Sequence, residues 1–455
     1  MPAARLIMSA RSIIDSMSPC IVRAQLTRIT SSPLGYRLAK GVFWTLAGSV
    51  ISRGLMLLGG VLVARILGRA VFGEFGVVRS TVDMFFVFAG FGLGVTATKH
   101  VAEFCNSDPE RAGRIINLSE RTAAITGGVM AVGLAVFAPW LAERALSAPH
   151  LAESLRIGAL VLFLSALNSA QTGALSGFED FKSLAGVNLI VAAISLPILV
   201  GGAYIGGLTG AVWALAIGLA VNWSLNRAAL TRAASIRGVP LHHRDAHREK
   251  GILWAFSVPA VLSGLLFSPV NWACVALLVS QKDGYSEMGL YSAANQWRAA
   301  VLFIPSMLAG VALPMLSNLS GAASKPQYRK VLMINLLLTL AVSGTVAFFL
   351  VVAAGPIMRA YGPGFCQGAD VLRIIALVTT LMAVNSVIGQ AIASRGNMWI
   401  GLLFNALWAV VILGATYTLV QRGMGALGLA WAMLISYLLH TVWQGVYLIR
   451  ILCCF

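Results

Sequence analysis

Charge is what this sequence has least of. Only 11% of its 455 residues are charged, against about 25% in soluble domains, and 58% are hydrophobic. Apolar runs of roughly 18 or more residues recur along most of the chain, and each is long enough to cross a hydrocarbon core of about 30 Å as a helix. The runs lack the apolar/polar alternation that strands of a membrane barrel need. The sequence therefore predicts an all-α integral membrane protein.

Signatures of enzymes, metals and cofactors are also missing. There is no P-loop, G-x-S-x-G or H-E-x-x-H motif, and no span contains paired carboxylates. None of the six cysteines forms a C-x-x-C pair. His242, His243 and His247 lie near Asp245 and Glu249, but this spacing matches no known metal site, so we interpret the segment as a solvated linker. We expect no catalytic residues, no metal and no cofactor.

The apolar runs predict about twelve transmembrane helices. We place them near 41–64, 76–98, 122–142, 157–178, 184–205, 208–226, 252–280, 288–316, 331–354, 371–393, 398–420 and 426–448. The fifth and sixth are separated only by Gly206-Gly207, so eleven or thirteen spans are the alternatives. Asp108-Pro109-Glu110 has the N-cap, N1 proline and first-turn acid that begin a helix, and we expect a short cytoplasmic one there.

Basic residues are unevenly divided between the two sides that these spans define. With the N-terminus in the cytoplasm, 22 Lys and Arg residues fall in the inner segments and 8 in the outer ones. This bias predicts that both termini are cytoplasmic. It also accounts for the net charge of +17 as a topology signal, so we expect no nucleic-acid partner.

The chain reads as two copies of one unit. Leu155-Arg156-Ile157 and Asn168-Ser169 recur 217 positions later as Leu372-Arg373-Ile374 and Asn385-Ser386, and Asn188 recurs as Asn405. Six spans in each copy give parallel repeats, an arrangement of transporters whose two lobes enclose the substrate path. The predicted divisions are a cytoplasmic N-terminal extension (1–40), an N-lobe with spans 1–6 (41–226), a cytoplasmic linker (227–251) and a C-lobe with spans 7–12 (252–450).

The most distinctive features of the apolar spans are four charged residues inside them. They are Arg53 in span one, Arg79 and Asp83 in span two, and Arg298 in span eight. An arginine at the centre of a bilayer costs about 2.5–3.5 kcal/mol on insertion scales, so such residues face protein or water. Aligning Gly73 with Gly289 places Arg298 about one turn from the position of Arg79 in the other copy. We therefore predict a central cationic cavity that contacts substrate through the three arginines.

Polar neighbours on the same helical faces extend this prediction. Ser49 and Ser52 share a stripe with Arg53, and Asn295 shares one with Arg298, so all three are candidates for lining the path. Two alternatives stay open. Asp83 is either a coupling site or a structural partner of Arg79, four residues away, and the long stem of Arg53 allows it to reach the head-group layer.

The stretch from Lys40 to Glu103 resembles the opening of oligosaccharide flippases of the Wzx type. The similar elements are Ser52-Arg53, Val63-Ala64-Arg65-Ile66-Leu67-Gly68 and Phe72-Gly73-Glu74-Phe75-Gly76, with Gly289-Leu290-Tyr291-Ser292-Ala293-Ala294 in the second copy. These flippases belong to the multidrug/oligosaccharidyl-lipid/polysaccharide (MOP) exporter superfamily. The resemblance implies V-shaped lobes of six helices and transfer of an undecaprenyl-pyrophosphate-linked O-antigen or exopolysaccharide unit across the bacterial inner membrane. Related lipid flippases use arginines of spans one, two and eight, which match Arg53, Arg79 and Arg298.

The partners that follow are the lipid-linked oligosaccharide, the phospholipid bilayer, and a polysaccharide polymerase and chain-length regulator. A multidrug/cation antiporter of the same fold is the first alternative, although such sites favour intramembrane acids without excess arginine. A membrane glycosyltransferase or polymerase is the second, and it would need a large outer loop with catalytic groups. The outer loops here are short, so the sequence favours the flippase.

Overall fold

The computed structural model describes residues 33–90, 92–241, 249, 266–307, 325–395 and 398–453, with the backbone alone for 33–47, 325, 398 and 451–453. All regular elements in these ranges are helices. They are α3 (Pro33–Gly90), α4 (Leu93–Phe104), α5 (Pro109–Trp140), η1 (Leu141–Ala145), η2 (Pro149–Leu151), α6 (Ala152–Gly177), α7 (Phe181–Ile236), α10 (Phe267–Val279), α11 (Gly284–Gln296), α13 (Lys325–Tyr361), η5 (Pro363–Gly368), α14 (Ala369–Ala393), α15 (Met398–Gln421) and α16 (Gly425–Cys453). Residues 298–307 continue α11 as a further helical stretch after a turn at Trp297.

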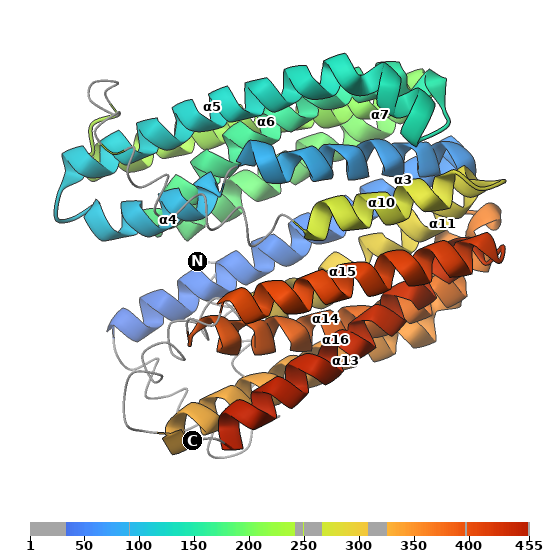
Figure 1. The fold of residues 1–455 in the computed structure, drawn as a ribbon. Coiled ribbons are helices and arrows are strands. Elements are labelled where there is room, and N and C mark those ends of the chain that lie inside the picture. The colour runs from blue at the N-terminus through green and yellow to red at the C-terminus, as the bar shows by residue number, and fades with distance from the viewer. Residues whose placement is uncertain are drawn as a thin grey trace, which may run out of the picture.

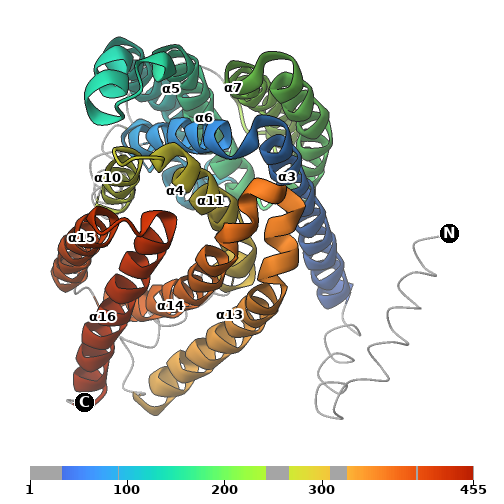
Figure 2. The same cartoon turned by 90° about the vertical axis from the view of Figure 1, so that its right-hand side faces the viewer.

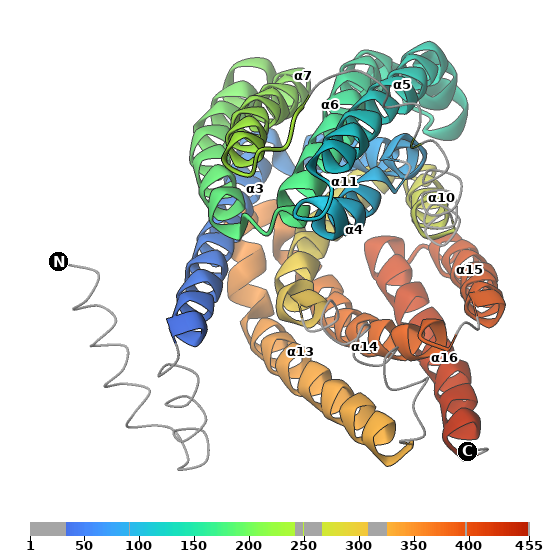
Figure 3. The same ribbon diagram turned by 90° about the vertical axis from the view of Figure 1, so that its left-hand side faces the viewer.

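The helices form two groups. Helices α4–α7 lie in one half of the molecule and α10–α16 in the other, with α10 and α11 on the side that faces the first half (Figures 1 and 3). Helix α3 packs against α7 in its own half and against α11 of the other half. The first part of α3 extends away from both bundles toward the N-terminal end of the chain (Figure 2). The main contact between the halves is therefore made by α3 and α11.

Two glycine breaks divide the longest helices. Within the described ranges, eight helices are long and apolar enough to cross a membrane. Helix α3 is interrupted at Gly68, whose φ is 76°, and α7 at Gly206 and Gly207, where Gly207 has a φ of 54°. A side chain disfavours such positive φ angles, so glycine permits the chain to turn there. The predicted division at Gly206-Gly207 is thus present, and both α3 and α7 are long enough to cross twice, while the total of twelve spans stays a prediction.

Two predicted boundaries differ from the structure. The second span was placed at 76–98, but its helix already follows the break at Gly68 and ends at Gly90, and α4 is a separate helix. Asp108 does cap a helix, since its side chain accepts a hydrogen bond from the Arg111 amide at 2.9 Å. That helix is α5, which runs for 32 residues. The helix continues through Gly113 without a break, so the expected short helix is the start of the third span.

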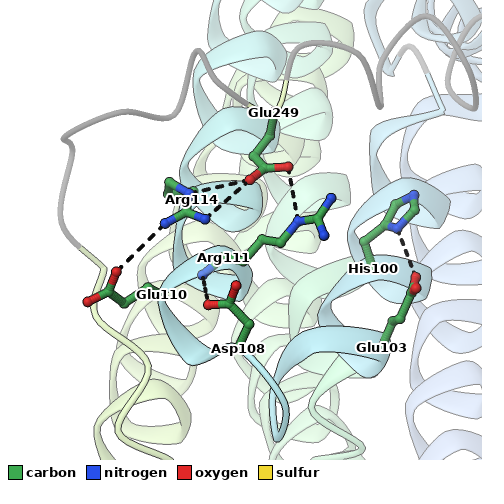
Figure 4. A network of polar contacts seen from close by, with 7 residues as sticks. All are labelled: His100, Glu103, Asp108, Glu110, Arg111, Arg114 and Glu249. Atoms are coloured by element: carbon green, nitrogen blue, oxygen red, sulfur yellow. Dashed lines mark hydrogen bonds and ion pairs between the residues drawn. The ribbon is translucent and has the colours of Figure 1, made fainter.

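Both ends of the linker between the halves are fastened to α5. Helix α7 continues to Ile236, beyond the predicted start of the linker at 227. A Cβ added to Gly113 would lie 2.1 Å from the carbonyl oxygen of Pro240, so the chain leaving α7 touches α5 directly. Glu249, 8% exposed, accepts hydrogen bonds from Arg111 at 3.2 Å and Arg114 at 3.4 Å (Figure 4). The predicted histidine group at 242–247 lies outside the described residues.

Candidate functional site

Arg53 points from one half of the molecule to the other. It lies on α3 before the break at Gly68, and its Nη1 donates to the carbonyl oxygen of Ala299 at 3.3 Å. Its guanidinium also lies over the ring of Phe303, 4.4 Å from the ring centre. Both partners belong to the helical stretch that follows α11. Arg53 therefore contacts the other half of the molecule at Ala299, the residue after Arg298. Its side chain is held there and not at a helix end.

Arg79 and Arg298 both lie near enough to Asp83 to interact with its charge. Asp83 lies one turn after Arg79 on α3 and interacts electrostatically with both arginines, although they come from opposite halves of the molecule. Arg79 also lies near the ring of Phe75, 6.0 Å from its centre. The structure thus gathers Arg53, Arg79, Asp83 and Arg298 along the contact between α3 and α11.

In the part of the chain that the structure describes, the three arginines form no ion pair with a carboxylate. Among the described residues, none of them has a carboxylate oxygen within 4.0 Å, in contrast to Arg69, Arg111, Arg114, Arg227 and Arg373. The side chains of Arg53, Arg79 and Asp83 are exposed and that of Arg298 is half-buried. Guanidinium groups without a fixed partner are suited to an incoming anion, and their planar donors match phosphate oxygens in pairs.

The predicted path-lining residues differ in how their polar groups are used. Ser52 is 7% exposed, and its hydroxyl donates to the Gly48 carbonyl in its own helix at 2.8 Å. Ser49 is half-buried. Asn295 has an amide oxygen that is buried without a partner among the described residues, and the same holds for the Ser292 hydroxyl on the same helix. Unsatisfied buried polar atoms are costly, so α11 carries unused hydrogen-bonding capacity one turn before Arg298.

An interface near the predicted outer surface was missed by the sequence analysis. Arg69, assigned there to a loop, forms an ion pair with Glu287 across the contact of α3 and α11. Its Nε donates to the Ser286 carbonyl at 2.9 Å and its Nη1 to Gln367 at 3.0 Å. The signal for this interface was present in the aligned glycines Gly73 and Gly289, because small residues at equivalent positions of two repeats allow helices to cross closely.

A cavity of about 470 Å³ lies elsewhere, at the glycine breaks of α3 and α7. Its lining is mainly apolar and includes Ile66, Val71 and Ala203. None of the three arginines contributes to it. The arginine cluster is therefore a feature of the interface between the halves and separate from this pocket.

A family model described as "Polysaccharide biosynthesis protein" matches residues 38–320. The chain belongs to this family. It is 28% identical to the EPS I polysaccharide export inner membrane protein EpsE of Ralstonia nicotianae (strain ATCC BAA-1114 / GMI1000) over 88% of this chain and 91% of the relative. It is 26% identical to the lipid III flippase of Escherichia coli (strain K12) over 62% of this chain and 68% of that protein.

Solved structures identify the fold. An inward-facing multidrug resistance MATE family transporter of the MOP superfamily superposes with a TM-score of 0.69 at 15% identity, covering 90% of this chain and 98% of the transporter. The lipid II flippase MurJ in an inward closed conformation gives 0.68 at 14%, covering 89% and 87%. The expected all-helical MOP fold is confirmed. With eight helices in the described ranges that are long and apolar enough to cross a membrane, this family member is a multi-pass membrane protein.

Proposed function

We propose that this protein flips an undecaprenyl-pyrophosphate-linked oligosaccharide, the repeat unit of an O-antigen or exopolysaccharide, across the inner membrane by alternating access. One observation carries the proposal. Arg53, Arg79 and Arg298 come from both halves of the molecule, meet at one interface and form no ion pair with the described carboxylates. A pyrophosphate head group supplies the negative charge that they lack.

The proposed cycle connects this geometry to flipping. First, the pyrophosphate binds the arginines, while the lipid chain stays between helices and the sugars enter the space between the lobes. Neutralising the arginines removes the repulsion between the two halves, which lets the lobes rock about the bound head group. The unused polar atoms of Asn295 and Ser292 then serve as hydrogen-bonding sites near the head group. The polysaccharide export protein and the lipid III flippase among the relatives support this substrate class.

We also propose the topology that the sequence predicts. It has twelve spans, both termini in the cytoplasm, an N-lobe over 41–226 and a C-lobe over 252–450. Delivery of repeat units to the outer leaflet makes a polysaccharide polymerase and its chain-length regulator the expected partners. The alternative, a multidrug/cation antiporter, has fold similarity in its favour. Three arginines without an ion pair in the described ranges disfavour it, because they would repel a cationic substrate.

A leaflet-accessibility assay tests the proposal. The protein is reconstituted in proteoliposomes with labelled undecaprenyl-pyrophosphate oligosaccharide, and an impermeant reagent reports the sugars that reach the other leaflet. Each charge-assisted hydrogen bond contributes about 1.5–3 kcal/mol, so Arg53→Ala with Arg298→Ala should slow flipping at least about tenfold. Arg373→Ala is the matched control, because Arg373 is exposed and paired with Asp370 in its own helix. Undiminished flipping by the double variant, or transport of a quaternary ammonium compound instead, would contradict the proposal.

A further inference from the structure

The contact between α3 and α11 contains a close crossing of two glycines. A Cβ added to Gly73 would lie 1.9 Å from the carbonyl oxygen of Tyr285, and one added to Gly289 would lie 2.1 Å from that of Arg69. The two glycines are equivalent positions of the two repeats, so the crossing lies where the halves meet symmetrically. One turn further along α3, a Cβ on Gly76 would lie 2.1 Å from the Ser292 hydroxyl. The backbones of α3 and α11 are in direct contact, so these two helices leave no space between them at this level.

Aromatic side chains fill the space beside the crossing. Phe72 of α3 lies 6.5 Å from Tyr361 and 6.0 Å from Phe365, measured between ring centres, and these partners belong to the other half of the molecule. All three side chains are at most 2% exposed. Burial of these rings stabilises the closed arrangement of the halves. The hydrophobic effect is non-directional, however, so it does not select one precise arrangement. Specific closure needs a polar contact.

Arg69 and Glu287 supply one such polar contact beside those of Arg65 with Ala360 and Tyr285 with Leu146, and Glu287 has a second attachment. One carboxylate oxygen pairs with Arg69. The other accepts the backbone amide of Ala426 at 2.8 Å, in the first turn of α16. Gly425 makes this approach possible, since a Cβ there would lie 2.3 Å from the same oxygen. A carboxylate at a helix N-terminus is stabilised by the amides and the helix dipole, so Glu287 is held within its own half whether or not Arg69 is present.

We infer that Arg69 and Glu287 form a one-sided latch that keeps the two halves closed at this end, with Glu287 fixed on α16 and Arg69 as the part that releases. When the halves separate, Arg69 loses its partners Glu287, Ser286 and Gln367 together. Glu287 keeps the Ala426 amide. The latch can therefore open and close repeatedly without unfolding either helix terminus. The predicted orientation makes this the periplasmic end, so the latch deepens the alternating-access part of the proposed function and rests on it.

The test reports closure without any substrate. In the full-length protein with its six cysteines replaced by serine, Ser292→Cys places a reporter thiol beneath the crossing. Labelling by a membrane-impermeant maleimide from the periplasmic side measures how often this end opens. Arg69→Ala should raise the labelling rate at least about tenfold. Glu287→Gln, whose amide oxygen can still accept the Ala426 amide, should give an intermediate rise.

Two controls keep the result interpretable. Asp370→Asn removes the exposed ion pair between Asp370 and Arg373. This pair lies at the same end of the molecule but joins two residues of α14, so labelling should be unchanged. Arg69→Lys keeps the charge and should label more slowly than Arg69→Ala. Equal labelling with and without Arg69, or an equal rise in the Asp370 variant, would overturn the latch. Because the readout needs no lipid-linked sugar, the latch can fail while flipping persists, and flipping can fail while the latch holds.

Discussion

The contact between the two halves has two regions that treat arginine in opposite ways. At the latch, Arg69 is bonded to Glu287, Ser286 and Gln367, and its helix crosses its neighbour at glycines. Along the same pair of helices, Arg53, Arg79 and Arg298 lack an ion pair within the described part of the chain. The same residue type thus serves two purposes. A paired arginine holds a conformation, and an unpaired one is available to a ligand.

This difference has an energetic basis. A buried or half-buried cation whose partner is removed keeps its desolvation cost, so breaking such a pair is strongly destabilising. A cation that starts without a partner has no such bond to lose, and an arriving anion gains the full interaction. The prediction for any charged residue here therefore depends on whether the structure gives it a partner. Three substitutions test this difference, one at the glycine crossing beside the latch, one at a second paired site on α5 and one in the unpaired region.

The largest effect is expected where the backbones touch. Gly73→Ala would place a Cβ at 1.9 Å from a carbonyl oxygen, so α3 and α11 must move apart. Overpacking of this kind typically costs about 1–3 kcal/mol, and here the cost falls on the closed state. We expect flipping to drop at least about tenfold, while the Ser292→Cys reporter becomes permanently accessible.

Gly133→Ala is the matched control for that experiment. Gly133 lies in α5, and a Cβ there meets nothing within 4 Å. Alanine favours a helix over glycine by up to about 1 kcal/mol, so this variant should be at least as stable as the parent and should flip normally. If both variants behave alike, the crossing does not limit transport.

Much of the architecture could be predicted from the residues alone. Apolar runs of membrane length predicted the helices, and the division at Gly206-Gly207 followed from two adjacent glycines. The internal repeat and the Wzx-like opening predicted the MOP fold. The predicted boundaries were less accurate where a helix is longer than its apolar run, as at Asp108. A helix continues through polar residues when no residue breaks it.

Contacts between distant segments were harder to predict. Arg53, Arg79 and Arg298 were identified because a charge within an apolar span is conspicuous. Arg69 and Glu287 lie near helix ends, where charge is ordinary, and their sequence separation of 218 gives no local signal. Likewise, Glu249 was placed in a solvated linker, yet it is buried between two arginines of α5. Pairing across the fold, and not residue type, decides these roles.

The next largest effect is expected at another paired charge, the carboxylate of Glu249. Glu249→Gln removes the charge that Arg111 and Arg114 share, which should weaken the attachment of the linker by about 1–3 kcal/mol. Amide hydrogen exchange over 237–241 should then accelerate roughly fivefold to a hundredfold. Glu110→Gln is the control, since Glu110 is 81% exposed and lies 3.8 Å from Arg114. An exposed pair contributes at most about 1 kcal/mol. Equal exchange in the two variants would show that Glu249 does not fasten the linker.

The smallest effect is expected from the same acid-to-amide change in the unpaired region. Asp83→Asn removes a negative charge near Arg79 and Arg298 without breaking an ion pair among the described residues, so thermal stability should not fall. The carboxylate repels a pyrophosphate, and an interaction of about 1 kcal/mol corresponds to roughly fivefold in affinity. Binding of the lipid-linked substrate, measured by titration in detergent, should therefore tighten by about that factor. Lower stability would instead make Asp83 a structural partner of Arg79. Abolished transport with unchanged binding would make it the coupling site, since a carboxylate that carries a proton between states cannot be replaced by an amide.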